Sequence, residues 1–175
     1  LIHIFEDEWM NKKDIVKSRI KNILGKTPNK IYGRNCLISE ISYKEAKDFL
    51  ETNHIQGYSV SSIRYGLYHK NELVAVMTFC GLRKNLGKKN LENAYELLRF
   101  CNRLDTVVIG GADKLLSHFI KDYKPNEIIS YADRRWSQGN LYEKLNFSLY
   151  NVSSPNYFYV IGRQRFNRFN FRKDR

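Results

Sequence analysis

The sequence is poor in cysteine and contains no long apolar run. Its three cysteines, Cys36, Cys80 and Cys101, are odd in number and widely spaced. This spacing does not fit a zinc site, and the apolar surroundings of all three are typical of reduced cysteines in an intracellular protein. No apolar stretch approaches the roughly 20 residues that cross a bilayer, and the first residues lack the design of a signal peptide. We therefore expect a cytoplasmic protein with no membrane partner.

Acidic residues are scarce relative to basic ones. The chain has 30 Lys and Arg residues against 18 Asp and Glu residues, a formal net charge of +12. An enzyme of small neutral metabolites has no need of this excess, whereas the positive field favours a polyanion, most commonly nucleic acid. A solubility surface, or association with a membrane or a ribosome, would also explain the charge. The hydrophobic content of 42% indicates a folded protein, and 175 residues suit one ordinary domain with a small appendage.

The order of predicted elements indicates a mixed α/β sheet. Residues 1–25 predict a strand, LIHIF, followed by a helix that Gly25 ends, and residues 26–35 read as a linker. Beyond the linker we predict a strand, a helix, three strands, a helix, a strand, a short helix and a strand. The first helix of this series has Ser42 and Glu45 in the capping-box arrangement.

Three segments of this series resemble the GNAT N-acyltransferase fold. They are the hairpin YGLYHKNELVAVMTF, the turn VVIGGADKLL and the segment GNLYEKLNF, and the resemblance covers residues 36–161. It implies a mixed, mostly antiparallel sheet flanked by helices, here preceded by a short strand and helix. It also implies an acyl-CoA cofactor, whose pyrophosphate binds the backbone N–H groups that open the helix after the glycines. The residues assigned to this site are Val108, Ile109, Gly110, Gly111 and Ala112.

The glycine motif departs from the family at one position. Val107 stands where the family has arginine or glutamine. The alternative is therefore that the two glycines form only a strand-to-helix turn, without binding CoA.

Two further resemblances point to phages. The segment SYADRRWSQGNLYEKLNF resembles the Mom-type DNA modification proteins of phages, which are GNAT-like and act on the exocyclic amine of adenine in DNA. Residues 1–25 resemble the last core strand and helix of phage homing endonucleases related to the very-short-patch-repair (EDxHD) nucleases. The catalytic residues of those nucleases precede this strand, so we expect an upstream part in the natural protein and neither nuclease activity nor a metal here. The acids of FEDEW then complement the dipole at the start of a helix.

The segment that follows residue 132 supplies the candidate catalytic groups. In an acyl transfer, Asp133 would orient or deprotonate an amine and Ser137 would hydrogen-bond the acceptor. The resemblance implies that Tyr142 protonates the departing thiolate. The alternative is that Asp133 pairs with Arg134 or Arg135 and that Tyr142 packs in the core. Earlier in the chain, His54 and Tyr58 form a pair that would hold an extruded base by stacking.

Two basic segments indicate contact with DNA, which we expect to be double-stranded. One is the loop LRKNLGKK, and the other is the tail of residues 162–175, in which arginines alternate with phenylalanines. Arginines contact phosphates, while aromatic rings stack on bases or wedge into a groove. The predicted nucleic-acid-binding residues are Arg83, Lys84, Lys88, Lys89, Arg134, Arg135, Arg163, Arg165, Arg168 and Arg172.

The leading hypothesis is a DNA-acting GNAT-like N-acyltransferase of a phage or mobile element. It would transfer an acyl group from acyl-CoA, such as acetyl-CoA, to a base amine, with adenine as the base. The alternative is a catalytically inactive GNAT-like module that recognises DNA for a homing endonuclease. A protein or small-amine acetyltransferase is the third hypothesis, and the oligomeric state is left open.

Overall fold

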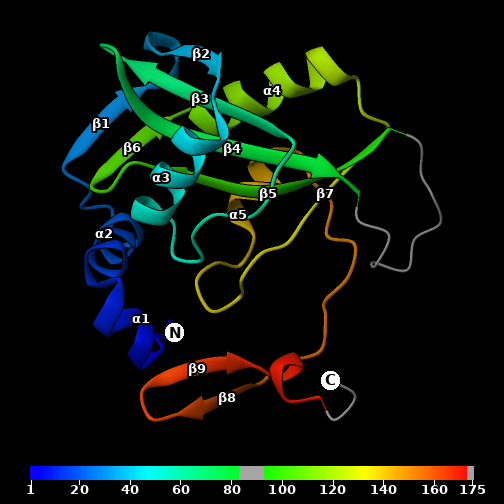
Figure 1. The fold of residues 1–175 in the computed structure, drawn as a ribbon. Coiled ribbons are helices and arrows are strands. Elements are labelled where there is room, and N and C mark those ends of the chain that lie inside the picture. The colour runs from blue at the N-terminus through cyan, green and yellow to red at the C-terminus, as the bar shows by residue number, and fades with distance from the viewer. Residues whose placement is uncertain (83–92, 173–175) are drawn as a thin grey trace. The chain divides into compact units, whose positions relative to one another are not determined.

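The computed structural model describes residues 1–82 and 93–172, and Figure 1 shows the arrangement of their elements. The chain divides into two compact units. Unit 1 combines the two ends of the chain, residues 1–13 and 133–175, and unit 2 holds residues 14–132. The predicted ranges divide the chain differently, because residues 1–25 are shared between the units.

Unit 2 is built on a five-stranded sheet in the order β2-β3-β4-β5-β7. The pairs β2–β3, β3–β4 and β4–β5 are antiparallel, and β7 runs parallel to β5. The predicted mixed, mostly antiparallel sheet is thereby confirmed. The strands are β2 (Leu37–Glu40), β3 (Ile63–His69), β4 (Glu72–Gly81), β5 (Ala94–Asn102) and β7 (Glu127–Ser130).

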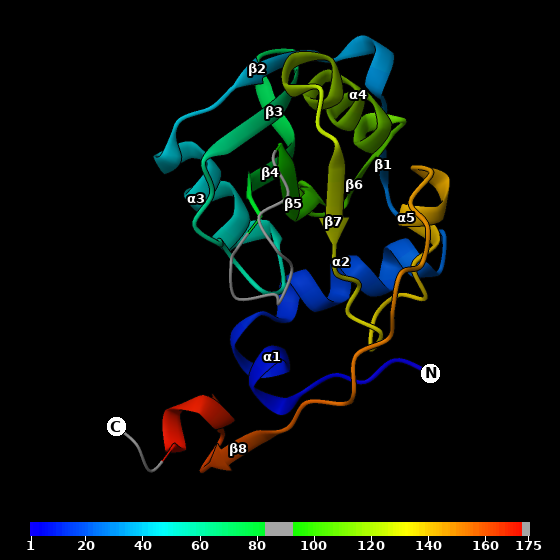
Figure 2. The ribbon, with the colours of Figure 1, turned by 90° about the vertical axis from the view of Figure 1, so that its right-hand side faces the viewer.

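Two helices cover opposite faces of this sheet (Figure 2). The helix α3 (Tyr43–Asn53) begins at the predicted capping box, in which Ser42 Oγ accepts from the backbone N–H of Glu45 at 3.2 Å. Its apolar side packs with strand residues that include Val76. On the other face, α4 (Gly111–Tyr123) stacks Phe119 on Phe79 of β4, with ring centroids 3.8 Å apart.

A second, two-stranded sheet lies where the sequence predicts a linker. The strand β1 (Asn29–Tyr32) pairs in parallel with β6 (Thr106–Ile109), and the 3-10 turn η1 (Gly33–Asn35) follows it. The helix α2 (Lys13–Ile23) is tied to the turn before β6, because Asp105 donates its N–H to Ser18 Oγ at 2.8 Å. The Asp105 carboxylate also pairs with Lys21 of α2 at 3.0 Å. Residues 14–32 therefore belong structurally to the sheet-bearing unit.

Unit 1 contains two departures from the predicted elements. Residues 1–5 form no strand, because no neighbouring strand pairs with them in the structure. The predicted final strand, β8, pairs with β9 in a separate antiparallel hairpin and not with the main sheet. The elements of this unit are α1 (Glu6–Asn11), α5 (Asn140–Lys144), β8 (Phe158–Ile161), β9 (Gln164–Asn167) and the 3-10 turn η3 (Arg168–Phe171). Across the described ranges, no helix is long and apolar enough to cross a membrane.

Candidate active site

The parallel ladder between β5 and β7 of unit 2 ends at the pair Leu97 and Ser130, whereas β5 continues to Asn102. We call this end of the ladder the β5–β7 fork. Ser130 Oγ donates to the Leu97 carbonyl at 3.0 Å and so adds a side-chain hydrogen bond to the last pair. Beyond this point, the edge of β5 is no longer paired with β7. An extended ligand that carries amides can pair with such an edge in the manner of an added strand.

A β-bulge lies directly after the last pair of this ladder. In the ladder between β4 and β5, Thr78 pairs with Arg99 while Phe79 pairs with Leu97, so Leu98 is an extra residue. A bulge bends its strand and redirects the groups beside it, and bulges are frequent next to active sites. The Leu98 carbonyl accepts from Arg99 Nη1 at 2.8 Å, which fixes its direction.

A buried carboxylate lies on β5 two residues before the bulge. Glu96 is only 8% exposed. Its neighbour Tyr95 packs edge-to-face on Phe119 of α4, so strand alternation places Glu96 on the face that α3 covers. A carboxylate in this position is a candidate general base that our sequence analysis did not identify. An acid directly before the apolar pair Leu97 and Leu98 of the strand AYELLRFCN was the available signal.

The loop after α3 is held against β5. Arg99 Nε donates to the Gly57 carbonyl at 3.1 Å. Within the loop, the hydroxyls of Tyr58 and Ser61 lie 3.1 Å apart and His54 Nδ1 accepts from the backbone of Gln56 at 3.2 Å. The loop bearing His54 and Tyr58 is thus attached to the strand that carries the bulge.

The predicted pyrophosphate-binding residues form the end of β6 and the first turn of α4. Gly110 adopts a left-handed backbone (φ 72°), and a Cβ at this position would meet nothing within 4 Å. Gly111, in contrast, is tightly packed, because a Cβ there would lie 2.8 Å from Val108 Cγ1. Val108, Gly111 and Ala112 are buried, while Ile109 and Gly110 are exposed. A ligand would therefore meet the Ile109–Gly110 end of the segment.

Strand β1 adds groups to this turn that sequence analysis assigned to a linker. Its register places Lys30 beside Val107 and Tyr32 beside Ile109. Lys30 is exposed, so β1 brings a basic side chain next to the position where the motif lacks one. Gly33 packs on the turn itself, because a Cβ there would lie 3.1 Å from Ile109 O and from Gly110 C. The contacts of β1 and Gly33 with the glycine turn depend on pairing between distant strands. No local sequence pattern therefore predicts them.

The three predicted catalytic residues belong to unit 1 and the predicted CoA-binding residues to unit 2. Asp133 accepts hydrogen bonds from Arg135, at 2.7 Å from Nη2 and 3.2 Å from Nε. Ser137 Oγ accepts from the Gly139 N–H at 3.0 Å, and the Tyr142 ring packs edge-to-face on Phe147. The ion pair anticipated between Asp133 and an adjacent arginine is present, and the catalytic roles stay predictions.

Within unit 1, Arg135 and Arg165 converge on one buried acid. Glu8, 5% exposed, accepts from Arg135 Nη2 at 3.0 Å and from Arg165 Nη2 at 3.1 Å. Both guanidinium groups lie over the Phe5 ring, at 4.4 and 3.8 Å from its centroid. We call Phe5, Glu8, Asp133, Arg135 and Arg165 the Glu8 cluster.

Opposing effects set the pKa of Glu8. Burial would raise this pKa, but the hydrogen bonds from Arg135 and Arg165, the charge of Arg135 and the Phe5 N–H outweigh burial and lower it. The carboxylate is therefore ionised at neutral pH. Two arginines that sequence analysis assigned to nucleic acid are engaged with acids in this cluster.

The other predicted nucleic-acid-binding residues have different environments. Arg163 is exposed and lies 3.6 Å from Glu6, and Arg134 is also exposed. Arg168 lies over the Tyr157 ring and Arg172 over the Phe169 ring. The predicted contacts Arg83, Lys84, Lys88 and Lys89 lie outside the described residues.

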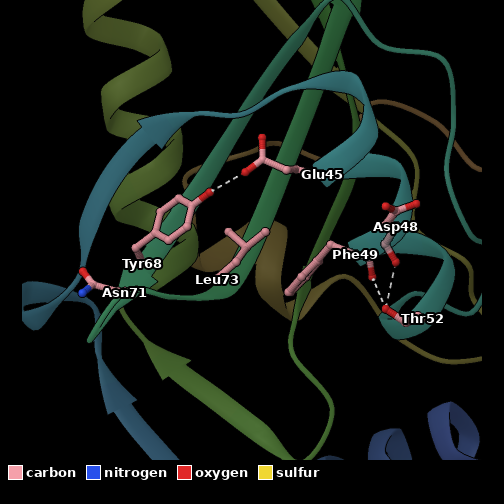
Figure 3. A pocket seen from close by; sticks show the side chains of 7 residues that line it. All are labelled: Glu45, Asp48, Phe49, Thr52, Tyr68, Asn71 and Leu73. Atoms are coloured by element: carbon pink, nitrogen blue, oxygen red, sulfur yellow. Dashed lines mark hydrogen bonds between the residues drawn. The ribbon is translucent and has the colours of Figure 1, made fainter.

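A hollow of about 520 Å³ lies between α3 and the β3–β4 hairpin (Figure 3). Tyr68 Oη donates to Glu45 Oε1 across it at 3.1 Å. The carboxylates of Glu45 and Asp48 make the hollow unsuitable for polyphosphates or DNA. Its lining residues are Glu45, Asp48, Phe49, Thr52, Tyr68, Asn71 and Leu73.

The described part of the chain contains no group of three or more His, Cys, Asp or Glu residues able to hold a metal ion.

Solved acetyltransferase structures resemble this chain. One is an aminoglycoside acetyltransferase from an uncultured soil metagenomic sample, solved with trehalose, with a TM-score of 0.50 and 12% identity over 73% of this chain and 98% of that one. A GNAT-family acetyltransferase from Streptococcus pneumoniae has a TM-score of 0.49 and 11% identity over 74% of this chain and 99% of that one. A ribosomal-protein-alanine N-acetyltransferase from Brucella melitensis biovar Abortus 2308 has a TM-score of 0.46 and 14% identity over 72% of this chain and 98% of that one.

The architecture, a mixed and mostly antiparallel sheet flanked by helices, therefore matches the GNAT acetyltransferase fold. No protein-family profile matches the chain, and no curated protein matches it. At these identities, the likeness concerns the fold.

Proposed function

We propose that this chain is a DNA-acting N-acyltransferase of a phage or mobile element, which transfers an acyl group from acyl-CoA to the amine of a base, adenine in the first instance. The observation that carries the acyl-transfer part is the β5–β7 fork, with its bulge at Leu98 and the buried Glu96 on the same strand. The net charge of +12 and the Mom-like segment support DNA as the acceptor.

The residues around the fork and the glycine turn fit an acyl-CoA. The edge of β5 beyond Leu97 would pair with the amides of the CoA arm, and the N–H groups that open α4, with Lys30, would hold the phosphates. Bound there, the cofactor supplies an activated acyl thioester. Glu96 would take the proton of the attacking amine. The roles of Asp133, Ser137 and Tyr142 stand as predicted, and substitution of each one tests them.

The test is calorimetric titration of the full chain with acetyl-CoA and with CoA. Gly110→Asn and Gly110→Asp form a matched pair, because both side chains tolerate a left-handed backbone and there is space for either. Only the aspartate places a negative charge at the helix start, so we expect saturable binding that the Asn variant keeps and the Asp variant loses. Equal affinities in the two variants would contradict a phosphate site at Gly110. DNA incubated with protein and acetyl-CoA is then analysed by mass spectrometry for an acylated base.

The second candidate function is a DNA-recognition module of a homing endonuclease. Val107 in place of arginine or glutamine and Asp113 in the first turn of α4 both weaken a pyrophosphate site. Residues 1–25 also resemble the end of a nuclease core. Absence of CoA binding up to millimolar concentration, with DNA still bound, would favour this module over the enzyme.

A further inference from the structure

The hairpin β8–β9 and the following turn η3 present aromatic rings paired with arginines. The Arg168 guanidinium lies 5.4 Å from the Tyr157 ring centroid and 5.2 Å from that of Phe169. Arg172 lies 4.2 Å from the Phe169 centroid on the same turn. We call Tyr157, Tyr159, Arg168, Phe169, Phe171 and Arg172 the arginine–aromatic surface.

The rings of this surface are half exposed. Tyr157 is 54% exposed and Phe169 is 39% exposed, and neighbouring Tyr159 and Phe171, with centroids 4.6 Å apart, are similarly open. Exposed aromatic groups of this extent are costly in water and mark binding surfaces.

The charge of the surface is positive. The sequence from Tyr157 to Arg172 contains no acidic residue. In the described structure, Arg163 and Arg165 of this stretch pair with acids of α1, whereas the recorded contacts of Arg168 and Arg172 are with rings. A ring contact uses the charge and face of a guanidinium and none of its N–H donors, which leaves those donors for phosphate oxygens.

We propose that the arginine–aromatic surface binds unpaired bases of DNA, with the rings stacking on base faces and Arg168 and Arg172 contacting the flanking phosphates. This inference rests on the proposed action on DNA. Bases in a duplex offer only their edges, whereas stacking on a side chain requires an open base face. Modification of a base amine also requires the base to leave the stack, so a surface that holds unpaired strand would serve that step.

The experiment measures fluorescence anisotropy of the full chain with one labelled sequence, prepared as single-stranded DNA, as duplex DNA and as single-stranded RNA. We expect tighter binding of single-stranded DNA than of the duplex. Phe169→Ala should weaken single-strand binding about five- to a hundredfold, the effect of losing one stacked base. Phe169→Trp should preserve it, because the variant keeps a stacking face. Val160→Ala is the matched control, since Val160 is 67% exposed on β8 and has no ring.

Each outcome decides the proposal. Preference for single-stranded DNA that Phe169→Ala removes and Phe169→Trp retains supports it. Equal or tighter duplex binding, insensitivity to Phe169→Ala, or preference for RNA overturns it and leaves acyl-CoA binding and duplex modification untouched. Failure to bind any DNA overturns this proposal together with the DNA part of the proposed function.

Discussion

Glu8 is the residue on which the interior of unit 1 depends. It joins two arginines that lie 127 and 157 positions away in the sequence. Removing one partner of a buried ion pair leaves the other charges without compensation. We expect Glu8→Gln to destabilise unit 1 by about 3 kcal/mol, measured by denaturant unfolding and limited proteolysis. Glu6→Gln is the control, because its carboxylate is exposed, and similar losses in the two variants would contradict this role.

Acid should weaken the same cluster. The pKa of Glu8 is lower in the folded state than in the unfolded chain, so its contribution is present at neutral pH. It is lost as the pH falls below about 4 and through the folded pKa. Stability curves of the wild type and Glu8→Gln should therefore converge at acid pH. A constant difference between the two down to pH values below that range would show that the charge of Glu8 is not involved.

Glu96 carries the chemical prediction at the residue scale. Its replacement by glutamine keeps the shape of the side chain and removes the basic oxygen. If acyl transfer to DNA is detected, Glu96→Gln should slow it by about a hundredfold or more, with acetyl-CoA affinity unchanged by calorimetry. A wild-type rate in this variant would show that Glu96 is not the general base. Asp133 would then be the next residue to test.

Cys101 is partly buried against core residues of unit 2, and its thiol should be unreactive. Burial raises the pKa of its thiol to about 12, against the opposing charges of Arg19 and Arg99. At mildly alkaline pH the thiol stays protonated, and the thiolate is the reactive form. Maleimide labelling of the native chain, followed by peptide mass spectrometry, should leave Cys101 unmodified until denaturant is added. Rapid labelling in the native state would contradict its packing in unit 2.

At the scale of elements, β1 supports the glycine turn through a close backbone approach. Gly33 has no space for a Cβ beside Ile109 and Gly110, whose backbone atoms would lie 3.1 Å away. Gly33→Ala should therefore shift the turn and weaken acetyl-CoA binding, with only a small loss of stability. Calorimetry and thermal unfolding separate these effects. Gly81→Ala is a control for glycine replacement, since a Cβ on Gly81 would meet nothing within 4 Å and its backbone is not left-handed.

Elements with a complete local signal were predicted correctly. The capping box at Ser42 and Glu45 and the hairpin of β3 and β4 follow from adjacent residues, as does the Gly110 turn into α4. The strand β1 and the β5–β7 fork were not predicted, because a four-residue parallel pairing and a ladder end are set by distant partners. For the same reason, Lys30 and Glu96 could not be placed beside the site from the sequence.

At the scale of the whole molecule, the positive charge should govern DNA affinity. Each phosphate contact contributes a slope in log affinity against log salt of about −0.7 on single-stranded DNA and about −0.9 on duplex DNA. The double variant Arg168→Ala, Arg172→Ala should flatten this slope by the amount that about two phosphate contacts contribute. It should leave the Glu8 cluster intact, because Arg165 is retained. Salt titrations of the wild type and the double variant measure the difference. An unchanged slope would remove the η3 arginines from the interface.

The composition of unit 1 from both chain ends has a consequence for the order of folding. Residues 14–132 are contiguous and contain their own sheet, so this part can fold as soon as it has been synthesised. Glu8 of α1 is synthesised before residues 14–132, but its partner Arg165 lies 157 positions later in the sequence. Closing such a long loop is slow. Refolding should therefore show an early phase for the sheet and a later phase in which the N-terminal segment becomes protected from proteolysis.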